Sequence, residues 1–297
     1  MRSIIFFIII IISALLIGAL ASYPLYMLVS LFTEARFHKL VSHTTLLSGL
    51  LLSLFYLKLC GVSFKDAFCT GIKRQNVWRD IVVSFSAGAL ILIAVESCLL
   101  SLAIHQPDPV ITYQWTVLLT IMIKSLLSGL VVALIEETIF RGALLGGLAR
   151  QTNVITALII SALIYAAVHF IKYPAPAADV DIAWFTGLEM LSHAFPRFAD
   201  ATIIDAFTTL FTLGLLLGLI RLRSGNIIQC IGLHAGIVTI HKMAAYLTNY
   251  HPGKPYDFLV NAYSSQLGYL ATACLSLAII LYYIFFMKNK MLHQAHR

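Results

Sequence analysis

The chain has 297 residues, of which 60% are hydrophobic and only 11% are charged, and its formal net charge is +7. A soluble domain carries about 25% charged residues, so the composition excludes a soluble globular protein and indicates that lipid covers much of the surface. The positive charge does not indicate nucleic-acid binding, because the basic residues lie in short clusters between apolar runs, as expected for a membrane protein.

Eight long apolar runs predict membrane-spanning helices. Each has about 20 residues or more, enough to cross a bilayer, and none shows the alternating pattern of a β-barrel strand. We therefore expect an all-α fold, a polytopic transmembrane helical bundle of about eight spans that forms a single membrane domain over residues 1–297. The predicted spans cover residues 4–32, 40–60, 80–104, 117–148, 153–171, 203–220, 227–247 and 267–287.

The first run has features of a signal peptide, because Arg2 precedes it and Ala19-Leu20-Ala21 resembles a cleavage site. The apolar stretch continues past Pro24 to residue 32, however, so we expect a retained first helix.

The distribution of Lys and Arg among the loops predicts the topology. Loops 61–79 and 221–226 and the C-terminal tail are rich in basic residues, whereas loops 105–116, 172–202 and 248–266 are poor in them. This alternation predicts an integral, multi-pass membrane protein with both termini in the cytoplasm, in the inner or plasma membrane if the chain is bacterial. The proline-containing loop 172–202 is expected to lie on the membrane surface.

Ionisable side chains inside the spans are candidate functional residues, because each costs about 2.5–3.5 kcal/mol in a bilayer. Glu137 and Arg141 are spaced i, i+4 and can pair on one helix face. Glu136 points about 100° away from Glu137, and an acidic group in an apolar site suits a general base. A buried ion pair that locks two helices together is the alternative interpretation.

His169 is predicted to face Glu136. The polar turn Gln151–Asn153 separates the fourth and fifth spans, and both residues are about 16 residues from it, or roughly 25 Å along their helices. Tyr165 precedes His169 by one helical turn and can line the same pocket.

His234 is the third candidate and lies in the seventh predicted span, about ten residues beyond the turn near Ser224 and Gly225. It is predicted to lie only about 15 Å deep, which does not match Glu136 unless the hairpin of spans 4 and 5 projects about 10 Å past the membrane. Gly232 and Gly236 form a small-xxx-small pair that lets another helix approach closely. His241 is interpreted as an interfacial residue beside Lys242.

These three elements, in this order, resemble the CPBP family of intramembrane proteases, which includes type II CAAX prenyl proteases and bacteriocin self-immunity (ABI) relatives. Glu136, Glu137 and Arg141 match its EExxxR motif, and Tyr165 and His169 match FxxxH with Tyr in place of Phe. His234 matches the first position of HxxxN, but Val238 replaces the Asn. The resemblance covers residues 115–247, which are the expected CPBP-like catalytic core.

The resemblance implies an intramembrane endopeptidase that cleaves membrane-anchored or membrane-proximal peptides within the lipid bilayer. Glu136 would activate a water with help from His169, His234 would stabilise the oxyanion, and Glu137 and Arg141 would support Glu136. We favour this metal-free glutamic mechanism without a cofactor. Glu136, His169 and His234 could alternatively hold zinc, although no HExxH motif is present.

Two alternative functions remain open. A non-catalytic scaffold or immunity protein of the same fold is supported by Val238, since losing one oxyanion donor costs about 2.7–4 kcal/mol; Thr239, Asn226 or Gln229 are candidate replacements. A proton-coupled transporter would use Glu96, Lys124, Glu136 and His169 as a relay, but no inverted repeat supports it.

Overall fold

A computed structural model describes residues 2–59, 63, 76–111, 113–177, 181–195, 198, 200–261 and 264–287. Helices dominate these residues, which confirms the predicted all-α polytopic bundle. The described residues include one small antiparallel pair of strands, β1 (His105–Pro107) and β2 (Thr248–Tyr250), with Gln106 opposite Asn249.

Every predicted span corresponds to a helix. Six of them are long and apolar enough to cross a membrane, and the fifth and eighth spans are shorter apolar helices, Val154–Val168 and Tyr269–Phe285. The fourth span is continuous in sequence from α5 through the π-helix η2 and α6. The helices of the eight spans are α1 (Arg2–Val29), α2 (Phe37–Leu59), α4 (Val77–Ser101), α5 (Trp115–Glu137), η2 (Thr138–Leu144), α6 (Leu145–Ala149), α7 (Val154–Val168), α9 (Ile204–Ser224), α10 (Ile228–Leu247), α11 (Tyr269–Tyr282) and the π-helix η6 (Tyr283–Met287).

The chain divides into two compact units. The first comprises Met1–Ala67 and Thr138–Ala201, and the second comprises Phe68–Glu137 and Thr202–Arg297. The boundary falls inside the fourth span, between the last residue of α5 and the first residue of η2. A single membrane domain over the whole chain stays a prediction.

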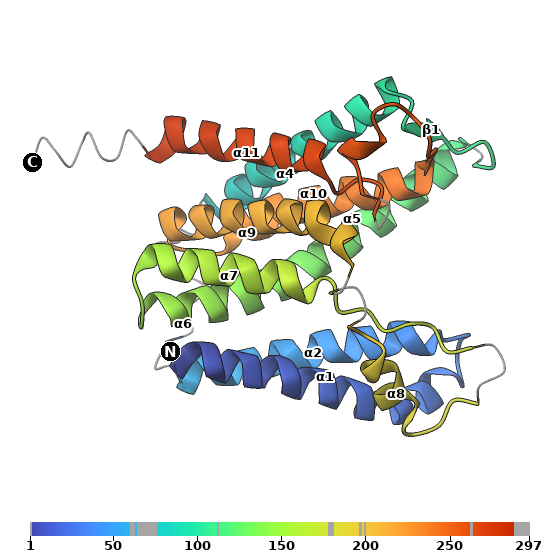
Figure 1. The fold of residues 1–297 in the computed structure, drawn as a ribbon, viewed down its shortest axis with the longest axis vertical. Coiled ribbons are helices and arrows are strands. Elements are labelled where there is room, and N and C mark those ends of the chain that lie inside the picture. The colour runs from blue at the N-terminus through green and yellow to red at the C-terminus, as the bar shows by residue number, and fades with distance from the viewer. Residues whose placement is uncertain are drawn as a thin grey trace, which may run out of the picture. The chain divides into compact units, whose positions relative to one another are not determined.

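The first unit contains α1 and α2, which lie side by side, and the short helix α8 (Thr186–Ser192) that packs against α1 (Figure 1). Met190 of α8 shares a buried apolar cluster with Leu15, Phe37 and Tyr173. The neighbouring Trp184 and Phe185 are exposed. Exposed aromatic rings suit the expected place of loop 172–202 on the membrane surface, which stays a prediction, as does retention of the first helix.

In the second unit, α10 packs against α4, α5 and α9. A Cβ atom added at Gly232 or Gly236 would collide with the backbone of α4, and one added at Gly88 of α4 would collide with the carbonyl of Leu233. This close approach of two backbones confirms the small-xxx-small prediction for Gly232 and Gly236.

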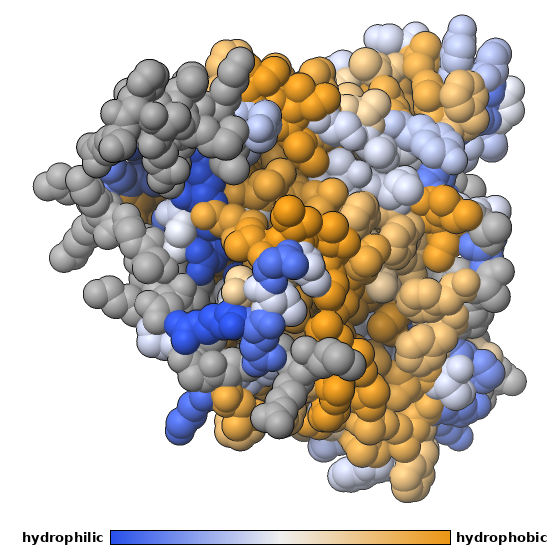
Figure 2. Space-filling model, turned by 60° about the vertical axis from the view of Figure 1, so that its left-hand side comes forward, coloured by the Kyte–Doolittle hydropathy of each residue, from blue (hydrophilic) through white to orange (hydrophobic). Residues whose placement is uncertain are grey.

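Hydrophobic residues cover much of the face drawn in Figure 2, and many large apolar side chains of α1, α2, α4 and α5 are exposed. Such a surface is stable only in lipid, so the chain is an integral membrane protein. Most of the basic loop 61–79 and the tail 288–297 lie outside the described residues, so the cytoplasmic side of the termini stays a prediction.

Candidate active site

Two carboxylates and an imidazole meet in the second unit. Glu136 and Glu137 are the last two residues of α5, and His234 lies on α10. His234 Nδ1 is 2.7 Å from Oε1 of Glu137, and its Nε2 is 3.9 Å from Oε2 of Glu136. The imidazole therefore contacts both members of the Glu-Glu pair through different nitrogen atoms.

A close contact between α5 and α10 positions this group. A Cβ atom at Gly129, two turns before Glu137, would lie 2.6 Å from Oγ1 of Thr239 and 2.9 Å from the carbonyl oxygen of Ala235. Ala133, one turn nearer to the site, is completely buried. The small residues on this face of α5 let α10 approach closely enough for its imidazole to reach the carboxylates.

The two carboxylate side chains differ in how deeply they are buried. The Glu137 side chain is fully buried, that of His234 is 4% exposed, and that of Glu136 is 15% exposed. A buried carboxylate is costly unless a donor satisfies it, which gives the Glu137–His234 hydrogen bond a structural role. Glu136 is the member of the pair that water can reach more easily.

The different depths expected for His234 and Glu136 do not keep the two side chains apart, because they lie 3.9 Å from each other. The fourth span has 35 residues, well above the roughly 20 needed to cross the hydrocarbon layer. It is therefore long enough for the hairpin of spans 4 and 5 to project past the membrane, the condition under which the two residues were expected to meet. The projection itself stays a prediction.

The other motif residues lie in the first unit, around the ring of Tyr165. The guanidinium carbon of Arg141 lies 4.2 Å from the centre of this ring, and Phe140 packs edge-on against it at 5.1 Å. Arg141 and Tyr165 are almost completely buried. The cation–π contact therefore holds η2 against α7 with a buried positive charge between them.

His169 follows directly after α7, as a helix-end histidine. Its ring packs against Tyr165 at 4.6 Å, and its Nδ1 lies 2.7 Å from the backbone carbonyl of Tyr165. Because a carbonyl can only accept, Nδ1 carries the proton and donates it. In the neutral imidazole the lone pair then resides on Nε2, which fixes the tautomer of this ring.

Two predicted pairings join residues of different units and stay predictions. One is the meeting of Glu136 with His169, and the other is the ion pair between Glu137 and Arg141. The i, i+4 argument for the second pair assumed a regular α-helix, but residues 138–144 wind as a π-helix. The sequence did not indicate this π-helix; such irregular turns occur frequently at functional sites.

Two of the three residues proposed to replace the missing Asn at position 238, Thr239 and Asn226, have other hydrogen bonds. Thr239 donates to the carbonyl of Ala235 at 2.7 Å, inside the contact with Gly129. Asn226 accepts from the amide of Ile228 and donates to the carbonyl of Ser224, in the turn that begins α10. Both side chains therefore stabilise local structure.

The remaining ionisable candidates of the second unit have partners or lie at its surface. Glu96 Oε1 is 2.8 Å from Nδ1 of His105 and accepts from Thr248, so it ties α4 to the β1–β2 pair. Lys242 donates to the hydroxyl of Ser128. Lys124 is exposed on α5.

Within the described part of the chain, no group of three or more His, Cys, Asp or Glu side chains is arranged to hold a metal ion. Because His169 lies in the other unit, zinc binding by Glu136, His169 and His234 stays a prediction, and no reaction step below passes through a metal.

The fold and the Glu136–Glu137–His234 group define a multi-span helical membrane protein with a buried carboxylate–imidazole site. Residues 116–240 match the model of the family described as type II CAAX prenyl endopeptidase, Rce1-like, which confirms the resemblance inferred from the motifs. The matched residues run from α5 into α10 and include Glu136, Glu137 and His234. No curated protein and no solved structure matches the chain.

Proposed function

We propose that the chain is an intramembrane endopeptidase in which Glu136 activates a water molecule that attacks a peptide carbonyl. The observation that carries this proposal is His234 held between the two carboxylates of α5, inside the segment that matches the protease family. A carboxylate base beside an imidazole donor is the minimum set for peptide hydrolysis without a covalent intermediate.

In the first step, the Glu136 carboxylate takes a proton from water as the water oxygen attacks the carbonyl carbon. The carbonyl oxygen becomes the oxyanion of a tetrahedral intermediate. In the second step, Glu136 returns the proton to the amide nitrogen, the carbon–nitrogen bond breaks, and an amine and a carboxylic acid leave. The Glu136 side chain is 15% exposed whereas Glu137 is fully buried, which makes Glu136 the more suitable base for a water molecule.

His234 is proposed to stabilise the oxyanion from Nε2, the nitrogen that faces Glu136. An ionised Glu137 accepts the Nδ1 proton and fixes the ring orientation, as carboxylates do for other functional histidines. Donation from Nε2 in addition requires an imidazolium. In a water-poor site, such an oriented donor is worth more than the same donor in water.

His169 is proposed to assist Glu136 through Nε2, because Nδ1 donates to the Tyr165 carbonyl. Arg141 and Tyr165 are positioning residues in this proposal. They hold η2 and α7 together and so determine where His169 stands. The substrate is proposed to be a membrane-anchored or membrane-proximal peptide, which reaches the buried carboxylates from the lipid phase.

A non-catalytic scaffold or immunity protein is a second candidate, favoured by Val238 at the position of the expected Asn donor. The variants Glu136→Gln and His169→Ala separate the functions when tested in cells for cleavage of a reporter peptide and for the biological phenotype. A protease loses cleavage in both variants while protein levels stay normal. A scaffold keeps its phenotype, and a transporter instead loses pH-dependent flux.

A further inference from the structure

Lys124 is a cation inside a membrane-spanning helix, and the proposed peptidase chemistry does not use it. It lies on α5, is exposed, and makes no hydrogen bond or ion pair within the described part of the chain. Lys242, on the neighbouring α10, donates instead to Ser128. Ionisable residues in membrane spans normally face a partner or a polar cavity. We therefore expect the exposed ammonium group of Lys124 to interact with a ligand.

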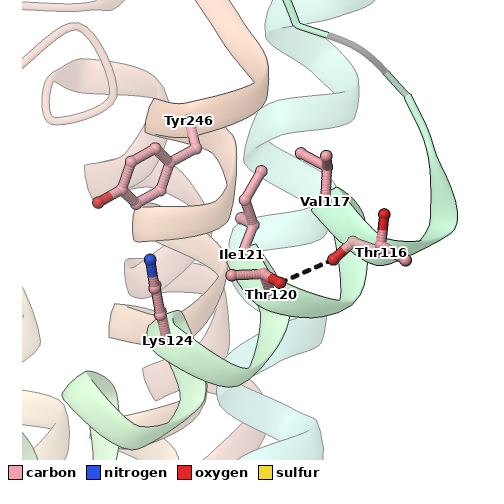
Figure 3. Close-up of a pocket in the computed structure, with 6 residues that line it drawn as sticks. All are labelled: Thr116, Val117, Thr120, Ile121, Lys124 and Tyr246. Atoms are coloured by element: carbon pink, nitrogen blue, oxygen red, sulfur yellow. Dashed lines mark hydrogen bonds between the residues drawn. The ribbon is translucent and has the colours of Figure 1, made fainter.

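The side chain of Lys124 lines a pocket of about 360 Å³ on the outside of α5 and α10. Figure 3 shows the side chain extending toward Tyr246 of α10. Thr116 and Thr120 precede Lys124 at four-residue spacing, so the three polar residues share one face of α5. Val117 and Ile121 complete the lining.

The pocket is built to receive an anion. The hydroxyl group of Tyr246 makes no hydrogen bond within the described residues, and Figure 3 shows the Lys124 side chain extending toward it, so the two can donate to one ligand. Thr116 lines the same pocket two turns earlier on α5, and its hydroxyl group also makes no hydrogen bond within the described residues. Thr120 donates to the carbonyl of Thr116 at 2.7 Å, and its hydroxyl oxygen can only accept. None of the described residues that line the pocket carries a carboxylate, so these residues do not repel a negatively charged ligand.

The position of the pocket along the helix identifies the source of the anion. Lys124 is about 14 Å along the helix axis from Trp115, the first residue of α5. Trp115 and Tyr113 are exposed aromatic residues of the kind that mark the membrane–water interface. A lysine stem can bridge much of the remaining depth, so the ammonium group reaches the headgroup region.

Apolar side chains extend from the pocket toward the bilayer centre. Ile123, next to Lys124, and Leu127, one turn further along α5, are exposed. They offer a surface for acyl chains close to the cation and hydroxyl groups of the pocket. This combination matches the two parts of an anionic phospholipid, a phosphate headgroup and hydrocarbon chains.

We propose that the pocket formed by Thr116, Lys124 and Tyr246 binds the phosphate group of an anionic phospholipid from the surrounding bilayer. The site is separate from the Glu136–Glu137–His234 group, and the proposal does not depend on peptidase activity.

The test uses the full-length protein in vesicles that contain phosphatidylcholine with a minor fraction of phosphatidylglycerol, and native mass spectrometry to measure the lipid retained by the protein. Lys124→Gln is expected to lower phosphatidylglycerol retention about fivefold, the effect of one lysine near an anionic membrane surface. Tyr246→Phe should weaken retention less. Lys254→Gln, the matched change at a lysine outside the pocket, should leave it unchanged.

Equal retention by Lys124→Gln and the wild-type protein would overturn the proposal, and so would an equal loss in Lys254→Gln. Displacement of the lipid by soluble glycerol phosphate would show that the pocket takes free anions and would overturn the assignment to a lipid. If Lys124→Gln fails to fold in phosphatidylcholine alone, Lys124→Arg replaces it. That variant keeps the charge and must keep the lipid; a folded Lys124→Arg protein without retained lipid contradicts the proposal.

Discussion

The Nδ1 atom of His234 lies 2.7 Å from Oε1 of Glu137, and this contact gives the two adjacent glutamates different roles. Glu137 is fully buried and holds the ring, whereas the partly exposed Glu136 faces the other ring nitrogen at 3.9 Å. Two like charges side by side in a membrane helix would repel without such a partner. The imidazole between them explains why both can be present.

Replacing Glu137 with Gln should lower kcat/KM by about 10–100-fold, the usual cost of removing a carboxylate that orients a functional histidine. The amide keeps the size of the side chain and one acceptor oxygen, so the fold should persist. The measurement is peptide cleavage by the reconstituted protein, with the thermal midpoint recorded in parallel. Glu34→Gln, at an exposed position far from any motif, is the control for the loss of one negative charge.

Tyr165→Phe should retain most activity and stability, because the ring that contacts Arg141 and His169 remains in place. Tyr165→Leu removes the ring and leaves the buried guanidinium of Arg141 without its cation–π partner, at a cost of about 0.5–2 kcal/mol. Thermal unfolding and cleavage rates of the two variants test this difference. An equal loss in both would show that the hydroxyl group, and not the ring, is the important part.

Gly129→Ala should destabilise the protein by about 1–3 kcal/mol and reduce cleavage, because its Cβ would press on Thr239 and Ala235 and separate α5 from α10. Gly146→Ala is the matched control, since it is also helical and a Cβ there meets nothing within 4 Å. The control should be neutral or slightly stabilising, as expected for Ala in place of Gly in a helix. A Gly129→Ala protein as stable and active as the control would contradict the close packing.

Strong chelators should leave peptide cleavage unchanged, because the proposed mechanism needs only protein side chains and water. The measurement compares the cleavage rate before and after chelation and buffer exchange, and again after zinc is added back. Loss of activity that returns with zinc would instead establish the metal-dependent alternative with Glu136, His169 and His234 as ligands.

The charge of the loops predicts that both termini face the cytoplasm. Single cysteines introduced into loops 149–153 and 248–256 of a variant without native cysteines should therefore react with an impermeant thiol reagent from opposite sides of the membrane. Labelling of both positions from the same side would contradict the three spans predicted between these loops and with them the predicted topology.

The sequence predicted the spans well and the site in part. Long apolar runs determine helices in lipid, so even the short fifth and eighth spans could be located. The carboxylate pair, His169 and His234 stood out because ionisable groups are rare in such runs. The hydrogen bond between Glu137 and His234 could not be predicted. It depends on the angle at which α5 crosses α10 near Gly129, and that angle cannot be derived from the sequence.

The π-helix at Thr138–Leu144 could not be predicted from the sequence either, because this segment contains no Pro that would indicate irregular winding. It matters because it changes which residues share a helix face near Arg141. The sequence left open whether His234 reaches the depth of Glu136 for a related reason, because counting residues from a turn does not show how far a long span projects from the membrane.

A double-mutant cycle on Glu136 and His169 tests the central claim most directly, because it measures whether the two residues act in one site. The quantity is kcat/KM for peptide cleavage by the wild-type protein, Glu136→Gln, His169→Ala and the double variant, each reconstituted and folded. If Glu136 activates water with help from His169, the double variant should be no slower than the slower single variant, as for other residues that act as a unit. Losses that multiply in the double variant would contradict a shared site, and undiminished cleavage by Glu136→Gln would contradict its role as the base.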